Sequence, residues 1–215
     1  MAQNEEGRLL VVGCGALANA LLPRIMRMGW ARIGLMDGDR VEEKNLERQE
    51  LFAPVDVGRP KSEVLAAWLR HMPVAVQLVA VDAFIGPENA AEWITRHDAV
   101  ADCTDDAHAK LLLDQACAQA GKVLVSGSVH GVQAQVLTLH APGAQAQLDR
   151  FALFGGRPGV EQDGCDMRHV PLNTLHEAAR RMAGHLADWR KGKAVNGRID
   201  LFDGSAWITM AAPQG

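Results

Sequence analysis

The sequence predicts an α/β protein with a doubly wound, mainly parallel Rossmann-like sheet and a small C-terminal β extension. Two observations predict this fold class. Short apolar runs alternate with segments of helical spacing between residues 9 and 129, and a glycine-rich turn, "GCGALA" at residues 13–18, follows the first apolar run. The 215 residues suffice for one hydrophobic core and are short for two. We therefore expect a single domain over residues 1–215.

The first half of the chain carries the alternation. The continuous apolar run at residues 9–12 predicts a strand covered on both faces, and Leu17, Leu21 and Ile25 then recur at helical spacing. Further strands are expected within residues 31–37, 74–84, 98–106 and 122–129. Helices are expected between them, within residues 59–72, 88–97 and 107–121.

The second half changes character. Residues 131–143 predict a strand and turn, and residues 141–171, rich in Gly, Pro, Gln and Asp, predict a long irregular loop. A long helix is expected at residues 172–192. The Asp-Gly pair at 203–204 predicts a hairpin within residues 198–210.

Composition narrows the function classes. The formal net charge of −4 gives no basic footprint for nucleic acid or an anionic membrane, and no apolar run approaches a membrane span of roughly 20 residues. The N-terminus lacks the pattern of a signal peptide. No two of the four cysteines have C-x-x-C spacing, so we expect no zinc. These features indicate a cytoplasmic protein in a reducing compartment.

The glycine turn predicts a nucleotide site. Gly13 permits a tight turn, Gly15 lets the backbone approach phosphate, and the N–H groups of the following helix face the anion. Asp37 lies 24 residues after Gly13, near the usual spacing for an acid that binds ribose. The turn alone does not separate NAD, FAD, SAM and ATP.

The polar residues after Asp37 favour reacting phosphates. Asn45, Arg48 and Lys61 follow within "DGDRVEEKNLERQ" and "GRPKSE", and fixed cations suit charge that builds on phosphate. The pyrophosphate of NAD does not react, so hydride transfer needs none of them. In "DCTDD", residues 102–106, a carboxylate at the end of a strand could hold Mg²⁺ bridging phosphate oxygens.

At this point the sequence resembles the MoeB/ThiF/HesA family, the bacterial relatives of ubiquitin-activating enzymes. The resemblance is carried by "GCGALAN", "LMDGDRVEEKNLERQELF", "VGRPKSE", "DCTDDAHAK" and "VLVSGSVHGVQAQV", roughly over residues 9–137. It implies a short, zinc-less ATP-binding adenylation domain. Such a domain uses ATP and Mg²⁺ to adenylate a carboxylate, typically the C-terminal glycine of a small ubiquitin-like sulfur carrier, and releases pyrophosphate.

The resemblance also implies residue roles. Asp37 would bind the ribose, Asn45, Arg48 and Lys61 the triphosphate, and Asp105 the magnesium ion, while Gln49 would support the site. Arg48, Lys61 and Asp105 would carry the catalysis. The full set expected around the nucleotide is Gly13, Gly15, Ala16, Asp37, Asp39, Asn45, Arg48, Gln49 and Lys61.

The sequence departs from the family pattern in several places. Ala16 and Ala18 stand where glycines are usual and are expected to narrow the approach to nucleotide. Asp106 replaces Asn and adds charge near the phosphates, and Lys110 replaces Arg. Only Arg8 precedes the predicted first strand, where many members have an arginine-bearing helix that reaches the partner subunit's site.

Two other readings remain open. A non-catalytic nucleotide-binding or partner-binding module would explain the departures, and an NAD(P)-dependent oxidoreductase would explain the glycine turn and Asp37 alone. We expect a homodimer, as in family members, for which the apolar C-terminal helix could serve. Cys165 is expected to be a bystander thiol. Cys14, Cys103 and Cys117 are expected to pack in the turn, a strand end and a helix face, and His130, His140 and His169 to be structural or solvated.

Overall fold

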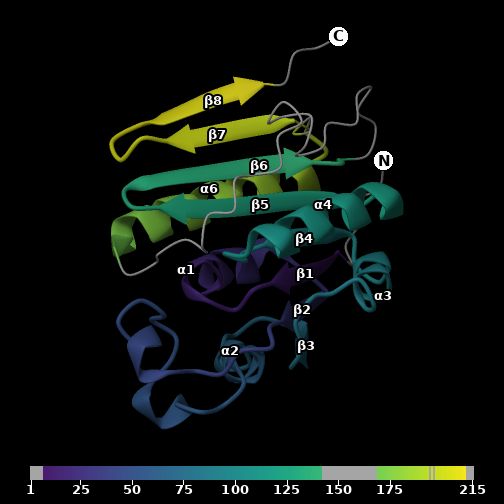
Figure 1. Cartoon of the computed structure of the whole chain (residues 1–215). Helices are drawn as coiled ribbons and strands as arrows, with labels where there is room; N and C mark the ends of the chain where they lie inside the picture. Colours follow the sequence, from purple (N-terminus) through teal and green to yellow (C-terminus); the bar gives the residue numbers. More distant parts are fainter. Residues whose placement is uncertain (1–6, 142–168, 194, 196, 212–215) are drawn as a thin grey trace.

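The computed structural model describes residues 7–141, 169–193, 195 and 197–211. These residues form one mixed sheet of eight strands in the order β3-β2-β1-β4-β5-β6-β7-β8 (Figure 1). The first five strands are parallel and the last three antiparallel. The strands are β1 (Arg8–Val12), β2 (Arg32–Met36), β3 (Gln77–Val81), β4 (Ala99–Asp102), β5 (Val123–His130), β6 (Gln133–Leu139), β7 (Arg198–Phe202) and β8 (Trp207–Ala211).

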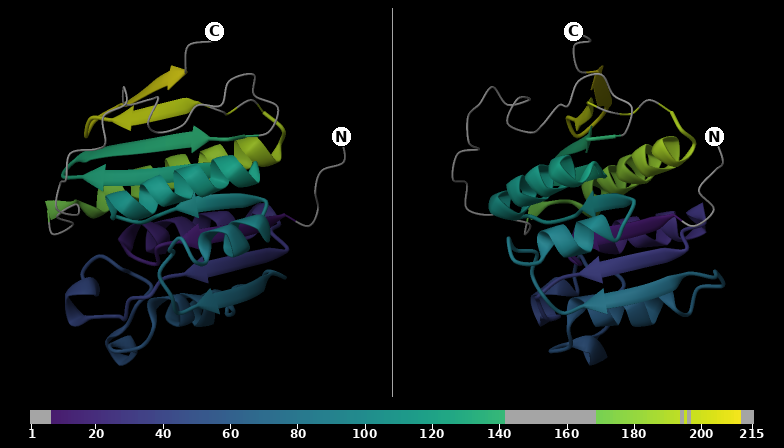
Figure 2. Two further views of the ribbon diagram at one scale, coloured as in Figure 1. Left: turned by 45° about the vertical axis from the view of Figure 1, so that its right-hand side comes forward. Right: turned by 90° about the vertical axis from the view of Figure 1, so that its right-hand side faces the viewer.

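Helices cover both faces of this sheet. One face carries α1 (Ala16–Ile25), α2 (Lys61–Leu69) and α6 (Leu172–Arg190), and the other carries α3 (Ala90–Thr95) and α4 (Ala107–Ala120). Figure 2 shows α4 and α6 on opposite sides in its right view. Short 3₁₀ turns complete the chain: η1 (Met26–Met28), η2 (Glu43–Asn45) and η3 (Pro54–Asp56).

The core follows from the alternation of side chains along buried strands. In β1, Leu9 and Val11 join the cluster beneath α1, α2 and α6, while Leu10 and Val12 join the cluster beneath α3 and α4. All four side chains are inaccessible or nearly so. A strand buried on both faces needs this continuous apolar run, so the reading of residues 9–12 is confirmed.

The predicted fold class is confirmed, and each predicted strand and helix exists within a few residues of its expected ends. Gly121 ends α4 in the left-handed conformation, as a C-terminal glycine does. The predicted hairpin is β7–β8, closed by the side chain of Asp203, which accepts hydrogen bonds from the backbone N–H groups of Ser205 and Ala206. Of the predicted loop at 141–171, residues 142–168 lie outside the described residues.

The apolar face of α6 is covered within the chain. Its buried residues, which include Leu175, Ala179 and Met182, pack against α1, β5 and β6. From the sequence, this apolar helix was expected to be able to serve as the dimerisation surface. The structure uses its apolar stripe to close the core instead. Across the described ranges, no helix combines the length and apolar character that crossing a membrane requires.

His97 makes the stability of this fold depend on pH. The imidazole is 1% exposed, its Nδ1 donates to the carbonyl of Trp93 at 2.6 Å, and its Nε2 is buried without a hydrogen-bond partner among the described residues. Burial lowers the pKa of His97 below its ordinary value. A lowered folded-state pKa means that stability is complete above the unfolded-state pKa and is lost as pH falls below it.

We therefore expect wild-type Tm to fall between pH 7.5 and pH 5.5, and to fall less in a His97→Asn variant. The asparagine amide keeps a donor for Trp93 and takes up no proton in this range. Thermal unfolding followed by circular dichroism at both pH values measures the difference. An equal fall in both proteins would show that His97 does not carry this dependence.

Candidate nucleotide-binding site

A pocket of about 1010 Å³ opens at the carboxyl ends of the parallel strands. The strand order reverses between β1 and β4, because β2 and β3 extend to one side and β4 and β5 to the other. In doubly wound sheets this switch point is where ligands bind. The pocket contains residues from the ends of β1, β2 and β4 and from the start of α1, so separate parts of the sequence meet at one edge.

The glycine turn is built around a close backbone contact. Gly13 has φ +86°, and a Cβ added to it would lie 2.8–2.9 Å from backbone atoms of Cys103 and Thr104. Gly15 is the N-cap of α1, supplies no side-chain cap, and has no atom within 4 Å of an added Cβ. The first N–H groups of α1 therefore lack a capping side chain beside an open pocket, which is the arrangement that binds phosphate.

The Asp37 carboxylate joins this turn to the next loop. One oxygen accepts the backbone N–H of Cys14 at 2.6 Å, and the other accepts that of Asp39 at 2.7 Å. Burial raises the pKa of the Asp37 carboxyl, although both hydrogen bonds and the nearby Lys61 oppose the shift. Asp37 lines the pocket, so the structure brings it to the same cavity as the glycine turn.

Asp39 holds Lys61. Its carboxylate lies 2.9 Å from the Lys61 ammonium, and its carbonyl accepts the Lys61 backbone N–H at 3.0 Å. The lysine side chain is 9% exposed and the Asp39 side chain 55% exposed. Both residues line the pocket. This ion pair holds the Lys61 ammonium group at the pocket wall. The main structural role of the Asp39 carboxylate is therefore to position Lys61.

The loop before Lys61 brings the other predicted residues to the same pocket. Asn45 closes η2, where its side-chain oxygen accepts the backbone N–H of Glu42 at 2.9 Å. The backbone N–H groups of Arg48 and Gln49 both donate to the Asn45 carbonyl. Asn45, Arg48 and Gln49 all line the pocket, and Gln49 is buried with an Oε1 that has no hydrogen-bond partner among the described residues.

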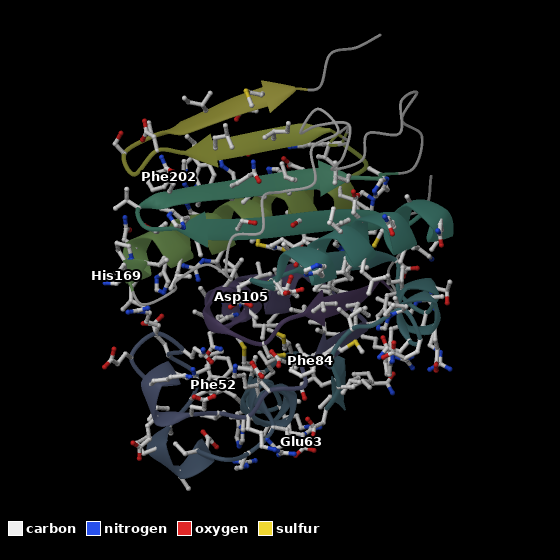
Figure 3. All side chains as sticks on the ribbon, in the orientation of Figure 1. Phe52, Glu63, Phe84, Asp105, His169 and Phe202 are labelled. Atoms are coloured by element: carbon white, nitrogen blue, oxygen red, sulfur yellow. The ribbon has the colours of Figure 1, made fainter. Side chains whose placement is uncertain are left out.

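Asp105 is an exposed residue of the turn between β4 and α4, and it lines the pocket (Figure 3). Its neighbour Asp106 is the N-cap of α4 and accepts the backbone N–H of Ala109 at 2.7 Å. Asp106 therefore adds its charge to the pocket lining, as expected. Its carboxylate also caps α4, a position at which aspartate is favoured.

Beneath this turn lies a buried ion pair that sequence reasoning did not find. Asp102, the last residue of β4, accepts hydrogen bonds from Lys110 at 3.1 Å and from the Ser126 hydroxyl at 2.5 Å. Lys110 also donates to the carbonyl of Gly127 at 2.8 Å. The Lys110 ammonium thus ties α4 to β4 and β5.

Two sequence expectations require correction. Ala18 was expected to narrow the approach to nucleotide, but it is fully buried in the core and does not line the pocket, whereas Ala16 does. Arg8 was placed before the first strand, but it opens β1 and forms an ion pair with Asp98 at 2.8 Å. That pair lies where β1 begins, at the opposite end of the strand from the pocket.

Sequence reasoning assigned no role to three other residues of this region. Lys44 and Phe84 line the pocket. Asn19, in α1, is buried and donates to the carbonyls of Cys14 and Gly15, while its oxygen accepts the backbone N–H of Leu51 at 3.0 Å. Asn19 thereby joins the glycine turn to the loop of Arg48. Its presence in "GCGALAN" was visible, but a single residue gives no signal of a contact 32 positions away.

The cysteines and histidines behave as expected wherever the structure describes them. Cys14, Cys103 and Cys117 are free and buried, and burial raises the pKa of each thiol. His140 is buried and pairs with Asp114 at 2.6 Å, while His130 and His169 are exposed. Cys165 lies outside the described residues.

Replacing Asn19 tests the link between the turn and the loop. Asn19→Ala leaves the partly buried N–H of Leu51 without its acceptor, which costs about 1 kcal/mol, the low end of the range for a buried unsatisfied donor. We expect Tm to fall by roughly 2–4 °C for each kcal/mol in a chain of this size. Asn173→Ala, at an exposed asparagine in the first turn of α6, is the matched control and should leave Tm within about 1 °C. Equal stability of the two variants in thermal unfolding would contradict the link.

Known proteins resemble this chain over most of its length. The ThiF family model matches residues 2–208. The chain is 30% identical over 202 residues to the sulfur carrier protein adenylyltransferase of Thermus thermophilus, covering 85% of this chain and 74% of that protein. It is 32% identical over 212 residues to the SAMP-activating enzyme E1 of Haloferax volcanii, covering 92% of this chain and 73% of that protein.

Longer relatives match over a shorter stretch. The adenylyltransferase and sulfurtransferase MOCS3 of Bos taurus is 38% identical over 135 residues, which is 63% of this chain and 30% of that protein. Among solved structures, E. coli MccB with AMPCPP and MccA has a TM-score of 0.79 at 17% identity, covering 97% of this chain and 65% of that one. This last likeness concerns the fold. From the family match and the two relatives that align over most of its length, this chain belongs to the ThiF family.

Proposed function

We propose that this protein uses ATP to adenylate a carboxylate, namely the C-terminal glycine of a small ubiquitin-like sulfur-carrier protein. The observation that carries the proposal is one pocket that combines a glycine turn, a buried acid, two basic side chains and an exposed carboxylate: Gly13, Asp37, Arg48, Lys61 and Asp105. The relatives that align over most of the chain are named for the activation of such carriers, which supports the substrate class.

The proposed reaction requires little covalent chemistry from the side chains of the protein itself. A substrate carboxylate oxygen attacks the α-phosphorus of ATP, a bond forms between them, and the bond to the pyrophosphate oxygen breaks. The attacking carboxylate is already ionised near pH 7, so the site needs no general base. Its task is to position the reactants and to offset charge on the phosphate oxygens, which suits Arg48 and Lys61.

The charge of the pocket supports a requirement for a divalent cation. Its lining includes six acidic residues and four basic ones, so the walls are net negative before a triphosphate enters. The described residues hold no group of three or more His, Cys, Asp or Glu side chains arranged for a metal. Mg²⁺ commonly binds through one or two carboxylates together with substrate phosphates. We propose that Asp105 supplies such a carboxylate, and that bound Mg²⁺ would neutralise charge on the phosphates.

The proposal extends to the setting of the reaction. We propose a single adenylation domain over residues 1–215, in the cytoplasm, acting as a homodimer without nucleic-acid or membrane partners. The single sheet of the described residues supports one domain, and the free cysteines among those residues, Cys14, Cys103 and Cys117, support a reducing compartment. The dimer surface would lie elsewhere than the apolar stripe of α6, which is buried within the chain.

ATP–pyrophosphate exchange tests the proposal. With a small carrier protein ending in Gly-Gly, wild-type protein and Mg²⁺ should transfer label from pyrophosphate into ATP. Arg48→Ala and Lys61→Ala should each lower the exchange rate by about 10²–10³-fold, as expected for loss of a group that stabilises developing charge. Arg40→Ala is the control, since Arg40 lies in the same stretch but pairs with Asp82 and does not line the pocket.

Asp105→Ala should lower exchange at a fixed Mg²⁺ concentration and raise the Mg²⁺ concentration needed for half-maximal rate, because one carboxylate ligand is lost. Rates measured over a Mg²⁺ titration separate this effect from a general loss of activity. Absence of exchange with every carrier tested, together with no ATP binding at millimolar concentration, would overturn the adenylation proposal. It would favour a non-catalytic partner-binding module.

A further inference from the structure

His176 joins the start of α6 to the loop that carries Arg48. Its Nε2 lies 2.6 Å from a carboxylate oxygen of Glu50, which follows Arg48 by two positions. A carboxylate oxygen only accepts hydrogen bonds, so the Nε2 of His176 carries the proton and donates. The two side chains are 126 positions apart in the sequence, so the fold alone brings them together.

This contact is one of two that fasten the loop to helices just after Arg48. The other is the Leu51 N–H, which donates to the Asn19 oxygen in α1 at 3.0 Å. Before the arginine, the Arg48 N–H itself donates to the Asn45 carbonyl at 3.1 Å. Because α1 and α6 pack against each other, both fastenings belong to one layer of the fold. Arg48 is therefore held between a turn on one side and a pair of helices on the other.

The helix itself stands back from the pocket. Among the described residues that line the pocket, none belongs to α6. The His176 and Glu50 side chains are 38% and 50% exposed, and exposed ion pairs add little to the stability of a fold. Loss of this pair is therefore expected to leave the fold intact and to free the Glu50 end of the loop. Such a displacement matters most for a group that must meet a ligand at a set distance.

We infer that His176 is a positioning residue that acts through Glu50 to hold Arg48 in place for the phosphates of the nucleotide. The inference rests on the proposed function, which assigns those phosphates to Arg48. The charged neighbours of His176 on α6, Glu177 and Arg180, pair with each other at 2.6 Å. His176 therefore pairs with the loop, while its neighbours pair within the helix. Nucleotide affinity then depends on a helix that lines no part of the pocket.

Isothermal titration calorimetry with ATP and Mg²⁺ tests the inference. His176→Ala and Glu50→Gln should each raise the Kd for ATP about two- to fivefold, the range that an exposed ion pair supports. The double variant should show no further rise, because both changes remove the same contact. His176→Lys keeps a cationic donor and should bind ATP as wild type does. Asn173→Ala, at an exposed position on the same helix, is the matched control and should also bind as wild type does.

A second background shows whether His176 acts through Arg48. In Arg48→Ala, titrated up to millimolar ATP, the further change His176→Ala should leave the Kd where it is, since the group to be positioned is gone. A two- to fivefold rise in that background would overturn the inference, as would weak ATP binding by His176→Lys. Both results would assign the effect to the helix or to the fold in general.

Two further outcomes separate this inference from the proposed function. If wild-type protein binds ATP and His176→Ala binds it equally well, or if the effects of His176→Ala and Glu50→Gln add fully, positioning by His176 is overturned and adenylation stands. If wild-type protein does not bind ATP at millimolar concentration, the proposed function is overturned and the inference falls with it.

Discussion

The buried carboxylate of Asp37 is the interaction on which the site depends. It accepts one backbone N–H from the glycine turn and one from the loop of Asp39, so a single side chain fixes two pocket-lining segments relative to each other. Asp39 in turn holds Lys61. Desolvation raises the pKa of Asp37, which is the cost of placing a carboxylate here, and its two short hydrogen bonds offset part of that cost.

A second buried carboxylate performs the same task on the other side of the switch point. Asp102 draws together the ammonium of Lys110 and the hydroxyl of Ser126, and so fixes the end of β4 on which the exposed Asp105 depends. Breaking such a pair would leave a buried charge uncompensated, which is why we read Lys110 as part of the scaffold. Asp105 lies at the pocket surface just beyond that strand end. The loop of Arg48 is held separately, by the hydrogen bond from the Leu51 N–H to Asn19.

Much of this could be predicted from the sequence, and the reasons are physical. A strand buried on both faces requires a continuous apolar run, and a turn with positive φ beside another backbone segment requires glycine. The strand and the turn within residues 9–15 could therefore be predicted from their local sequence. Contacts between residues far apart in the sequence leave no such local pattern. Nothing in the local sequence of Asn19 or Lys110 indicates which distant backbone each contacts. Ala18 was misassigned for the same reason, since helix direction decides whether its methyl group meets ligand or core.

The sequence also does not show what covers an apolar surface. The apolar stripe of α6 is visible in the sequence, but a stripe does not state whether its partner is another chain or the chain's own sheet. Here α6 packs on α1 and the strands beside it, and this packing closes the core behind the pocket. Gly127 shows how tight that contact is, because an added Cβ would lie 2.4 Å from the sulfur of Met182 and 2.8 Å from Leu17.

The central claim is that this pocket serves a triphosphate whose phosphates react, and not a dinucleotide. Calorimetric titration of the wild-type protein with ATP and with NAD, each in the presence of Mg²⁺, tests it most directly. The arrangement of Asp37, Lys61 and Asp105 predicts saturable ATP binding and at least about tenfold weaker binding of NAD, a difference of about 1.4 kcal/mol. Binding of NAD as tight as, or tighter than, that of ATP would contradict the account.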